Sequence, residues 1–312
     1  FRKWYKKGSK ILLREINEQV LPDGGNFELS TMYHLIFLED LLDIINIHRA
    51  FDRSLPDEVT GKIPMMLRWI KTMCHPDGEI SFFNDAAIGV TPSVKEIENY
   101  AKRLNFLSPV DDISPKQSLI SLKSSGYSRV GYDNLVAFID RASIGPDYIP
   151  AHAHADTLSF ELSLFQHRLI VNSGTSIYEE SEERHRQRGT SSHSTVLIDG
   201  INSSNVWGSF RVANRAKVFE TKDLQFGRKI TLSACHNGYH RIKGSPTHCR
   251  KWIFSDQLLV VEDFIKGKNH HEVDVIFPLH PLVNLLELSE NKVILDLLGN
   301  KIYINFEGNG LL

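Results

Sequence analysis

The spacing of apolar residues along the chain changes once, and this change constrains the fold more than any other feature. From about residue 5 to residue 107, apolar residues recur at intervals of three and four, which is the period of an amphipathic helix. After about residue 126 the period becomes two, and residues 157–164 alternate polar and apolar side chains without interruption. We therefore expect an α+β chain of more than one domain, with helices first and antiparallel sheets second, most simply a large β-sandwich.

The helical region contains one long apolar stripe. Its members are Leu35, Leu38, Leu42 and Ile45, and Ser30 or Thr31 precedes them as a candidate N-cap. Further helices are expected at about residues 59–74 and 93–104, which are separated by the turn-forming segments HPDGE and GVTP. These signals predict a set of helices joined by turns rich in glycine and proline.

The length of 312 residues favours two domains over one. We assign residues 1–107 to the helical domain, 108–126 to a linker or an entering strand, and 127–312 to the sheet domain. Half-buried strands are expected at residues 135–139, 157–164, 169–171, 195–198, 252–254, 258–261 and 271–277.

Charge and composition exclude several classes of function. A net charge of −2 with scattered basic residues gives no electrostatic basis for binding nucleic acid. No apolar run approaches the roughly 18 residues that span a bilayer. The chain opens without Met or a secretory signal pattern, so any signal peptide has been removed or lies upstream. Among the three cysteines, a Cys235–Cys249 disulfide and free thiols are both open.

The segment PAHAHAD places His152, His154 and Asp156 within five positions. If it is extended, the two imidazoles project from the same face and can share a metal ion or divide binding and reaction between them. The alternative is two half-exposed polar residues on a sheet face. Asn172 ends the second strand of the expected hairpin and His193 opens the next strand, so His154, Asn172 and His193 form a feasible set of Zn²⁺ ligands, although zinc prefers a carboxylate to an amide.

Four ordered motifs resemble those of the heparinase II/III-like family of polysaccharide lyases. The motifs are PDGGNFELSTMYHLIFLEDLLDI, PAHAHADTLSFELSLFQHRLIVNSGT, RGTSSHSTVLIDG and NVWGSFRV, and they cover most of residues 21–215. The corresponding family patterns are DGGHFELSPMYH, HGHAD, DPGT or DSGT, and TAAHNTV. Because the motifs come from both regions in the same order, their combination is more specific than any one of them.

The resemblance implies an incomplete (α/α) toroid followed by a large antiparallel β-sandwich, with a substrate cleft between them. Family members cleave polysaccharides that contain uronic acids by β-elimination. By position, Tyr33 matches the catalytic tyrosine, which is proposed to act as base, acid or both; an aromatic residue on the shoulder of a helix is the alternative. His152 matches a histidine that faces the cleft and either assists proton transfer or binds substrate. His154, Asn172 and His193 match a triad that holds zinc or a similar divalent ion and braces the site. Asp156 is either an orienting partner of an imidazole or a turn residue.

The chain departs from the family pattern in three ways, of which the smallest is Ala153 in place of a usual glycine. Asn172 stands where the family usually has Asp, which removes a negative charge and should weaken metal binding. No motif before residue 21 matches the Asn or His that neutralises the uronate carboxylate. We therefore expect a fragment or a trimmed chain, short at its end as well, and for the isolated piece both an active and an inactive enzyme are open.

Other polar residues have weaker assignments. Arg184, Arg186 and Arg188 form a basic cluster, from which Arg186 and Arg188, together with Tyr178, are candidate substrate-binding residues; a solvated loop is the alternative. Trp207 and Arg211 either bind sugar or, for Trp207, pack inside the sandwich. Glu161 and Glu262 are expected on the solvent side of strands. We assign a structural role to the remaining histidines singled out, which are His34, His236, His240, His270 and His271. For His34, lining of the cleft is the alternative.

These features predict a lyase acting on an acidic polysaccharide or oligosaccharide. The alternative is a non-catalytic glycan-binding relative with a role in surface polysaccharide biosynthesis or processing. A metal hydrolase is disfavoured, since no HExxH-like arrangement is present. A polymeric substrate indicates the periplasm or the exterior, with the cytoplasm as the alternative. The sequence names neither the polysaccharide nor the oligomeric state.

Overall fold

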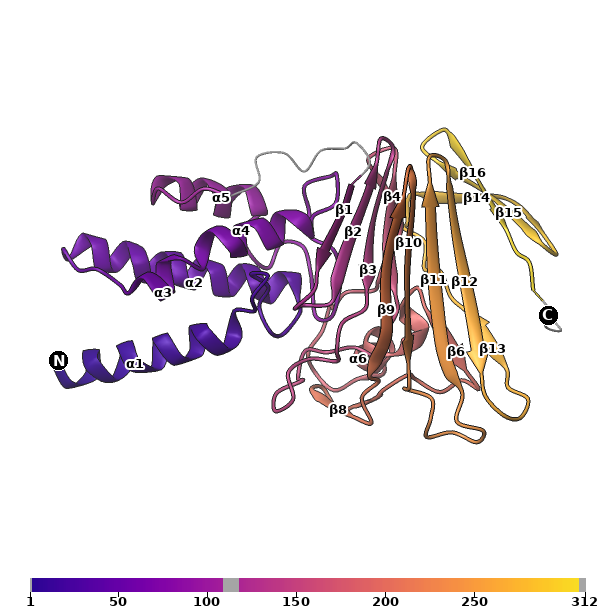
Figure 1. Ribbon diagram of the computed structural model, residues 1–312, viewed down its shortest axis with the longest axis horizontal. Helices are drawn as coiled ribbons and strands as arrows, with labels where there is room; N and C mark the ends of the chain where they lie inside the picture. Colours follow the sequence, from indigo (N-terminus) through magenta and orange to yellow (C-terminus); the bar gives the residue numbers. More distant parts are fainter. Residues whose placement is uncertain (1, 109–117, 309–312) are drawn as a thin grey trace.

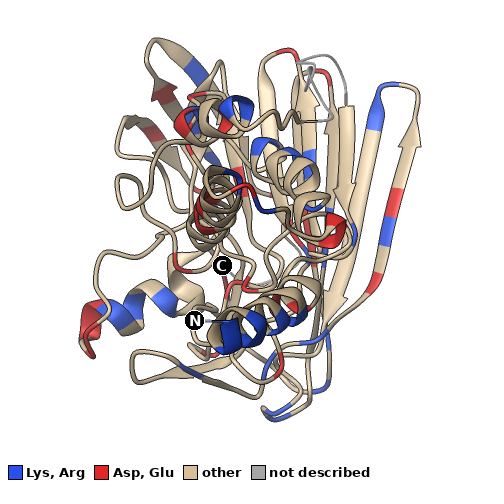
Figure 2. Cartoon of the chain, turned by 90° about the vertical axis from the view of Figure 1, so that its left-hand side faces the viewer, with Lys and Arg blue, Asp and Glu red and all other residues tan. Residues whose placement is uncertain are grey.

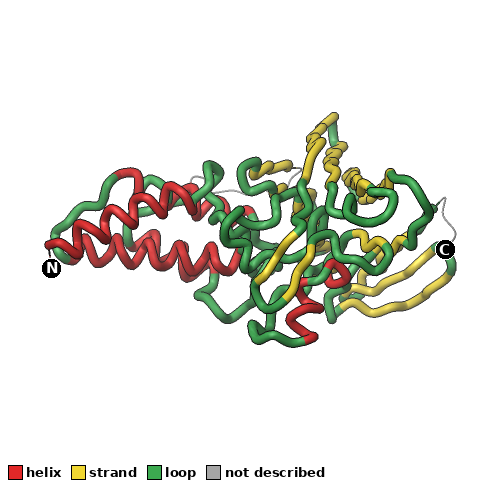
Figure 3. Tube along the Cα trace, turned by 90° about the horizontal axis from the view of Figure 1, so that it is seen from below, coloured by secondary structure: helices red, strands yellow, loops and turns green. Residues whose placement is uncertain are grey.

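The chain forms a helical part at its N-terminal end and a larger part built of antiparallel sheets (Figure 1). The computed structural model describes residues 2–108 and 118–308. Viewed from below, the long helices gather toward the N-terminus, and strands extend toward the C-terminus (Figure 3). The expected order of helices followed by antiparallel strands is confirmed. The assignment of the helices to an incomplete (α/α) toroid and of the sheets to a β-sandwich stays a prediction.

Within residues 2–108, the N-terminal part contains five helices. They are α1 (Arg2–Gln19), α2 (Thr31–Ala50), α3 (Asp57–Thr60), α4 (Ile63–Thr72) and α5 (Val94–Arg103). Ser30 caps α2 by accepting a hydrogen bond from the backbone N–H of Tyr33, and Ser93 and Glu96 form a capping box on α5. The single helix expected over residues 59–74 is instead divided into α3 and α4. Lys and Arg residues are frequent along α1 beside the N-terminus (Figure 2).

The helices share a core that continues into the first sheet. Leu38, Leu42 and Trp69 are fully or almost fully buried in one cluster that also contains Tyr127 and Phe138 from the sheet. The indole N–H of Trp69 donates to Ser125 Oγ at 3.0 Å. Burial of this shared apolar surface joins the two parts and keeps their contact face in a defined position.

The strands pair antiparallel throughout the described residues. The five-stranded sheet has the order β1 (Ser118–Leu122), β2 (Tyr127–Tyr132), β3 (Leu135–Asp140), β4 (Phe160–Leu164) and β5 (His167–Ile170). The four-stranded sheet has the order β12 (Leu258–Lys266), β11 (Thr247–Ser255), β10 (Lys229–His236) and β9 (Val218–Phe226).

Smaller units complete the β part. A three-stranded sheet contains β14 (Val283–Ser289), β15 (Lys292–Leu297) and β16 (Asn300–Asn305); β13 (Val273–Val275) pairs with β6 (Val196–Ile198), and β7 (Asn205–Trp207) pairs with β8 (Arg211–Ala213). The short helices α6 (Glu182–Arg188) and η1 (Thr190–Ser192) lie between β5 and β6 in the chain. The two large sheets contribute side chains to one core, in which Phe160 and Leu162 meet Leu232, Trp252 and Phe254.

Several strand boundaries differ from expectation. Strand β1 lies inside the segment 108–126, which agrees with the entering-strand alternative, while residues 109–117 lie outside the described residues. Residues 157–159 form a turn, in which Leu158 has a φ of 63°, so β4 begins at Phe160. Residues 150–156 are not a strand, and the two histidines of PAHAHAD therefore owe their positions to a loop.

Candidate active site

Asp85 is the centre of a buried polar cluster between the helical part and the sheets. It lies in the loop between α4 and α5, where its carbonyl accepts a hydrogen bond from Ser30 Oγ at 2.5 Å and its N–H donates to the His152 carbonyl at 3.1 Å. Its carboxylate accepts from His152 Nδ1 at 2.9 Å and from His154 Nε2 at 2.9 Å. One carboxylate thus orients both histidines of the PAHAHAD segment.

Arg184, on α6, neutralises Asp85. Its guanidinium donates to both carboxylate oxygens, with a distance of 2.7 Å from Nη2 to Oδ2. It also donates to Thr175 Oγ1 at 2.9 Å. Burial alone would raise the pKa of Asp85, but the hydrogen bonds from His152, His154 and Arg184 outweigh burial and hold the pKa well below its usual range. Asp85 is therefore ionised at neutral pH.

The ionised carboxylate fixes the tautomers of the two histidines. Asp85 can only accept hydrogen bonds, so neutral His152 carries its proton on Nδ1 and neutral His154 carries its proton on Nε2. His152 Nε2 and His154 Nδ1 are left with free lone pairs. The side chain of His152 is 19% exposed, and its Nε2 lies 3.8 Å from Glu28 Oε2. His152 can thus accept a proton from a molecule that enters the site.

Tyr33 lies against His152. It occupies the first turn of α2, where the Ser30 cap holds its backbone, and its ring centroid is 3.9 Å from that of His152. Its hydroxyl contacts the hydroxyl of Tyr178 at 3.1 Å. Burial raises the pKa of Tyr33, and the hydrogen bond with Tyr178 lowers it to a lesser extent. A neutral phenol beside an imidazole with a free lone pair forms an acid and a base within reach of one ligand.

His154, Asn172 and His193 come together in a buried group. The two imidazole centroids are 5.2 Å apart, and all three residues are at most 2% exposed. Six of their polar side-chain atoms are buried, and five have no hydrogen-bond partner: His154 Nδ1, His193 Nδ1 and Nε2, and Asn172 Oδ1 and Nδ2. Each unpaired buried polar atom costs on the order of 1–3 kcal/mol, so this concentration of them points to an additional bound group.

The chemistry of the triad fits a divalent cation. Burial lowers the pKa of His193 well below its usual value, and the neighbouring His154 lowers it further. Neutral imidazole is the form that coordinates a metal. No three His, Cys, Asp or Glu side chains in residues 2–108 and 118–308 are grouped to hold a metal ion, so a metal here depends on the Asn172 amide as third ligand.

Glu161 supports Asn172, which corrects the expectation that Glu161 faces solvent. It is fully buried, and its Oε1 accepts hydrogen bonds from the N–H of Asn172 at 3.0 Å and from the N–H of Phe82 at 2.9 Å. Its Oε2 pairs with His75 Nε2 at 2.6 Å. The alternation in β4 places this residue on a face that the helical part covers, and alternation alone does not distinguish that face from water.

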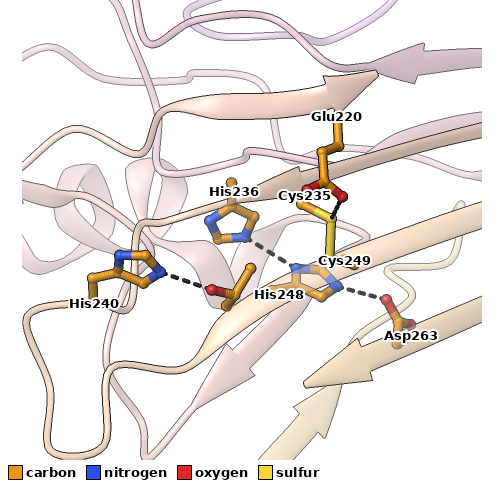
Figure 4. Close-up of a disulfide and its surroundings, with 8 residues drawn as sticks. Glu220, Cys235, His236, His240, His248, Cys249 and Asp263 are labelled. Atoms are coloured by element: carbon orange, nitrogen blue, oxygen red, sulfur yellow. Dashed lines mark hydrogen bonds and ion pairs between the residues drawn. A yellow bond between two sulfur atoms is a disulfide. The ribbon is translucent and has the colours of Figure 1, made fainter. Parts of the chain in front are cut away.

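A second buried polar chain lies beside the Cys235–Cys249 disulfide (Figure 4). The ring of His236 contacts His248 at 3.0 Å, and His248 contacts Asp263 at 2.6 Å. Asp263 also pairs with Arg250, whose Nη1 donates to the carbonyls of Leu158 and Ser194. Arg250 thereby ties the turn after Asp156 to the residue that follows His193. The adjacent Cys235 and Cys249, directly opposite on β10 and β11, form a disulfide.

The structure separates the predicted substrate-binding arginines. Arg188 is fully buried and donates to the carbonyls of Ala153, Gly208 and Arg211, which contradicts its assignment as a substrate-binding residue. Arg186 is exposed and pairs with Glu183, and its substrate role stays a prediction. Tyr178 lies beside Tyr33 in the candidate site. His34 is fully buried and stacks on Trp69 at 4.6 Å, which agrees with a structural role.

Sequence reasoning missed Asp85 and Glu28, and placed Arg184 only in a general basic cluster. Asp85 is the one charged residue of the loop segment FNDAAIG, which was the available signal. Its partner Arg184 is 99 positions away in the chain, so the pairing follows from tertiary structure alone. Of the helices that the structure describes, none combines the length and apolar character that crossing a bilayer requires.

The fold, in which a helical part precedes antiparallel sheets, is similar to that of heparinase III. A solved structure of heparinase III aligns with a TM-score of 0.73 and 17% identity over 97% of this chain and 54% of that chain. A heparan sulfate lyase from Pedobacter heparinus aligns with a TM-score of 0.71 and 20% identity over 94% of this chain and 46% of that chain.

The chain belongs to the heparinase II/III-like family. Residues 1–113 match the description "Heparinase II/III N-terminus" and residues 114–310 match "Heparinase II/III-like, C-terminal". A heparin-sulfate lyase of Bacteroides stercoris is 28% identical over 64% of this chain and 32% of its own length. Another, from Bacteroides thetaiotaomicron, is 21% identical over 98% of this chain and 46% of its own length. The chain therefore spans from about a third to just under half of the length of these relatives.

Proposed function

We propose that this chain carries the reacting groups of a polysaccharide lyase that cleaves a uronic-acid-containing glycan by β-elimination. The observation that carries the proposal is the placement of Tyr33 against His152, whose Nδ1 is held by Asp85. Membership in the heparinase II/III-like family and the names of the related lyases support it.

In the proposed reaction, His152 is the base and Tyr33 is the acid. The lone pair of His152 Nε2 accepts the C5 proton of the uronate, and the electron pair of the C5–H bond forms the C4–C5 double bond. The C4–O4 bond breaks, and the hydroxyl of Tyr33 gives its proton to O4 of the departing sugar. Burial keeps Tyr33 protonated, which suits it to the acid step, and Asp85 stabilises the imidazolium that His152 becomes. Before the next turnover, the imidazolium of His152 returns its extra proton to the phenolate of Tyr33, which restores both groups.

We further propose that His154, Asn172 and His193 hold a divalent metal, most simply Zn²⁺. Their unpaired buried nitrogen and oxygen atoms support this proposal. Bound there, the cation would brace the loops that carry the site. Because Asp85 holds His154 Nε2, the remaining Nδ1 is the ligand atom that this tautomer offers.

The proposed substrate is an acidic polysaccharide or oligosaccharide, and the proposed location is the periplasm or the exterior. The Cys235–Cys249 disulfide supports that location, because disulfides persist in oxidising compartments. The second candidate function is glycan binding without cleavage. The neutral amide of Asn172, in a triad that binds cations better with a carboxylate, favours this second candidate.

One assay distinguishes the two functions. The protein, in the full-length form that its gene encodes, is incubated with heparan sulfate, alginate and polygalacturonate, and the ultraviolet absorbance of the unsaturated uronate is followed. The same panel is titrated calorimetrically against the protein. A rise in absorbance with any of the three polymers supports the lyase. Binding without any rise in absorbance supports the non-catalytic function and excludes the lyase.

A further inference from the structure

The β7–β8 hairpin carries an exposed aromatic residue and an exposed cation on one face. Trp207 and Arg211 are directly opposite each other in the antiparallel pair, so their side chains project from the same side. Trp207 is 46% exposed, which corrects the expectation that it packs inside the sheets. Arg211 is exposed, and no ion pair involves it in the part of the chain that the structure describes.

The turn of this hairpin is continuous with the candidate active site. Phe210 follows Gly208 and Ser209 in the turn, and its ring stacks on Tyr178 with centroids 5.9 Å apart. The same ring meets the edge of His152 at 6.0 Å. The aromatic side chains of Tyr33, Tyr178 and Phe210 therefore form a continuous surface that extends from the candidate site onto the hairpin. Phe210 is 44% exposed, so a ligand can reach this surface.

Buried arginines of α6 hold the hairpin by its main chain. Arg188 donates to the carbonyls of Gly208 at 3.2 Å and Arg211 at 3.3 Å, and Arg184 Nε donates to the carbonyl of Ser209 at 3.0 Å. Arg184 also binds Asp85, which in turn holds His152 and His154. The guanidinium of Arg184 therefore fixes the position of the hairpin relative to the two histidines. The turn is therefore fixed without the side chains of Trp207 and Arg211, which are free to contact a ligand.

We propose that Trp207 and Arg211 form a subsite for an acidic sugar unit next to the sugar held at Tyr33 and His152. The apolar face of a pyranose ring suits stacking on an indole, and a guanidinium pairs in bidentate fashion with a carboxylate or a sulfate. A chain of acidic sugars offers both groups on successive units. The inference rests on the proposed function, because it assumes that a glycan occupies the site beside Phe210.

The test measures binding separately from cleavage. Trp207→Ala and Arg211→Ala are each placed in the full-length protein and in its Tyr33→Phe variant, and oligosaccharides of heparan sulfate, alginate and polygalacturonate are titrated by calorimetry. Phe226→Ala and Lys301→Ala are the matched controls, because Phe226 is 89% exposed at the end of β9 and Lys301 is exposed on β16. Thermal unfolding verifies that each variant is folded.

We expect each subsite variant to weaken binding of at least one acidic oligosaccharide about tenfold, which is the effect of losing one good stacking or charge-assisted contact. For cleavage of that substrate, KM should rise by a similar factor while kcat stays within about twofold, because neither residue touches the reacting atoms. Arg211→Lys should recover part of the loss, and the effect of Arg211→Ala should shrink as salt is added. The two control variants should bind like the wild type.

Two results would overturn the subsite. One is binding by Trp207→Ala and Arg211→Ala equal to that of the wild type, and the other is the failure of the wild type to bind any of the three acidic polymers. The proposed function fails in a different way. If the wild type binds without cleaving and the hairpin variants bind more weakly, the subsite stands and the lyase does not. If the wild type cleaves and the hairpin variants match it, the lyase stands and the subsite does not.

Discussion

Nδ1 of His152 lies 2.9 Å from Oδ2 of Asp85, while the other oxygen of the same carboxylate lies 2.9 Å from His154 Nε2. One side chain therefore orients both the proposed base and one proposed metal ligand. The fully buried guanidinium of Arg184 neutralises the negative charge of Asp85. This relationship makes Asp85 the residue whose loss should disturb the proposed chemistry without removing any group that touches a substrate.

Replacing Asp85 by Asn should lower kcat of the lyase reaction by about 10²- to 10⁴-fold, the range for losing a carboxylate that orients a catalytic histidine. An amide cannot accept from two imidazoles and a guanidinium at once, so His152 loses its tautomer and Arg184 loses its charge partner. The measurement is kcat together with thermal unfolding. The control is Asp77→Asn, which breaks a pair with Arg168 outside the site. An Asp85→Asn enzyme with wild-type kcat would exclude the orienting role.

Replacing Asn172 by Asp should increase the amount of zinc that the protein retains. The carboxylate adds a negative charge and a preferred oxygen ligand beside His154 and His193. Zinc per chain is measured by elemental analysis after loading and dialysis, with His193→Ala as the variant that should retain less than the wild type. Absence of zinc from the wild type and from Asn172→Asp alike would contradict a metal at this triad.

Acid should destabilise the fold through His34. Burial lowers the pKa of His34 to about 3, with the Met66 carbonyl opposing the shift weakly. Below its ordinary pKa of about 6.5, the unfolded chain binds a proton that the folded chain accepts only near pH 3. The stability is therefore fully present above pH 6.5 and falls as the pH decreases, by about 1.4 kcal/mol between pH 7.5 and pH 5.5.

Denaturant unfolding at these two pH values, in the wild type and in His34→Gln, isolates this contribution. Gln can still donate to the carbonyl that His34 contacts but has no proton to gain. The loss of stability on acidification should be smaller in the variant by about 1.4 kcal/mol for this one group. Equal losses in the two proteins would show that His34 does not remain neutral in the fold.

Reducing the Cys235–Cys249 disulfide should destabilise the β part. The two residues are 14 positions apart, and opening a loop of this length costs about 3 kcal/mol. Denaturant unfolding with and without reductant measures the change, and the double variant Cys235→Ala, Cys249→Ala should behave like the reduced wild type. Cys74→Ala is the control, since Cys74 is a free thiol whose pKa burial raises. Unchanged stability in reductant would argue against the bridge.

Local signals predicted much of the fold. The Ser30 cap, the helix beginning at Val94 and the hairpin of β4 and β5 all depend on residues within a few positions of one another. Local sequence patterns did not predict the environment of residues that contact the other part of the molecule. Glu161 follows the alternation of its strand, but the face that it occupies is covered by the helical part and not by water.

The candidate site shows the same division. Tyr33, His152, His154, Asn172 and His193 were all identifiable by their motifs, and the structure brings them into two adjoining clusters. Asp85 belongs to no motif and pairs with residues 67 to 99 positions away, so only the folded chain reveals it. Arg188 was assigned by its charge, whereas its environment is a set of carbonyl oxygens that a buried guanidinium can satisfy.

The most direct test of the central claim is the rate at which unsaturated uronate appears, followed by ultraviolet absorbance, in the wild type and in Tyr33→Phe with the polymer that binds best. Tyr33→Phe removes only the hydroxyl that lies 3.1 Å from Tyr178, and Tyr303→Phe, at an exposed position on β16, is its control. The account predicts a rising absorbance for the wild type and Tyr303→Phe, and a rate at least about 100-fold lower for Tyr33→Phe with binding retained. An undiminished rate in Tyr33→Phe, or no product from a wild type that binds the polymer, would contradict it.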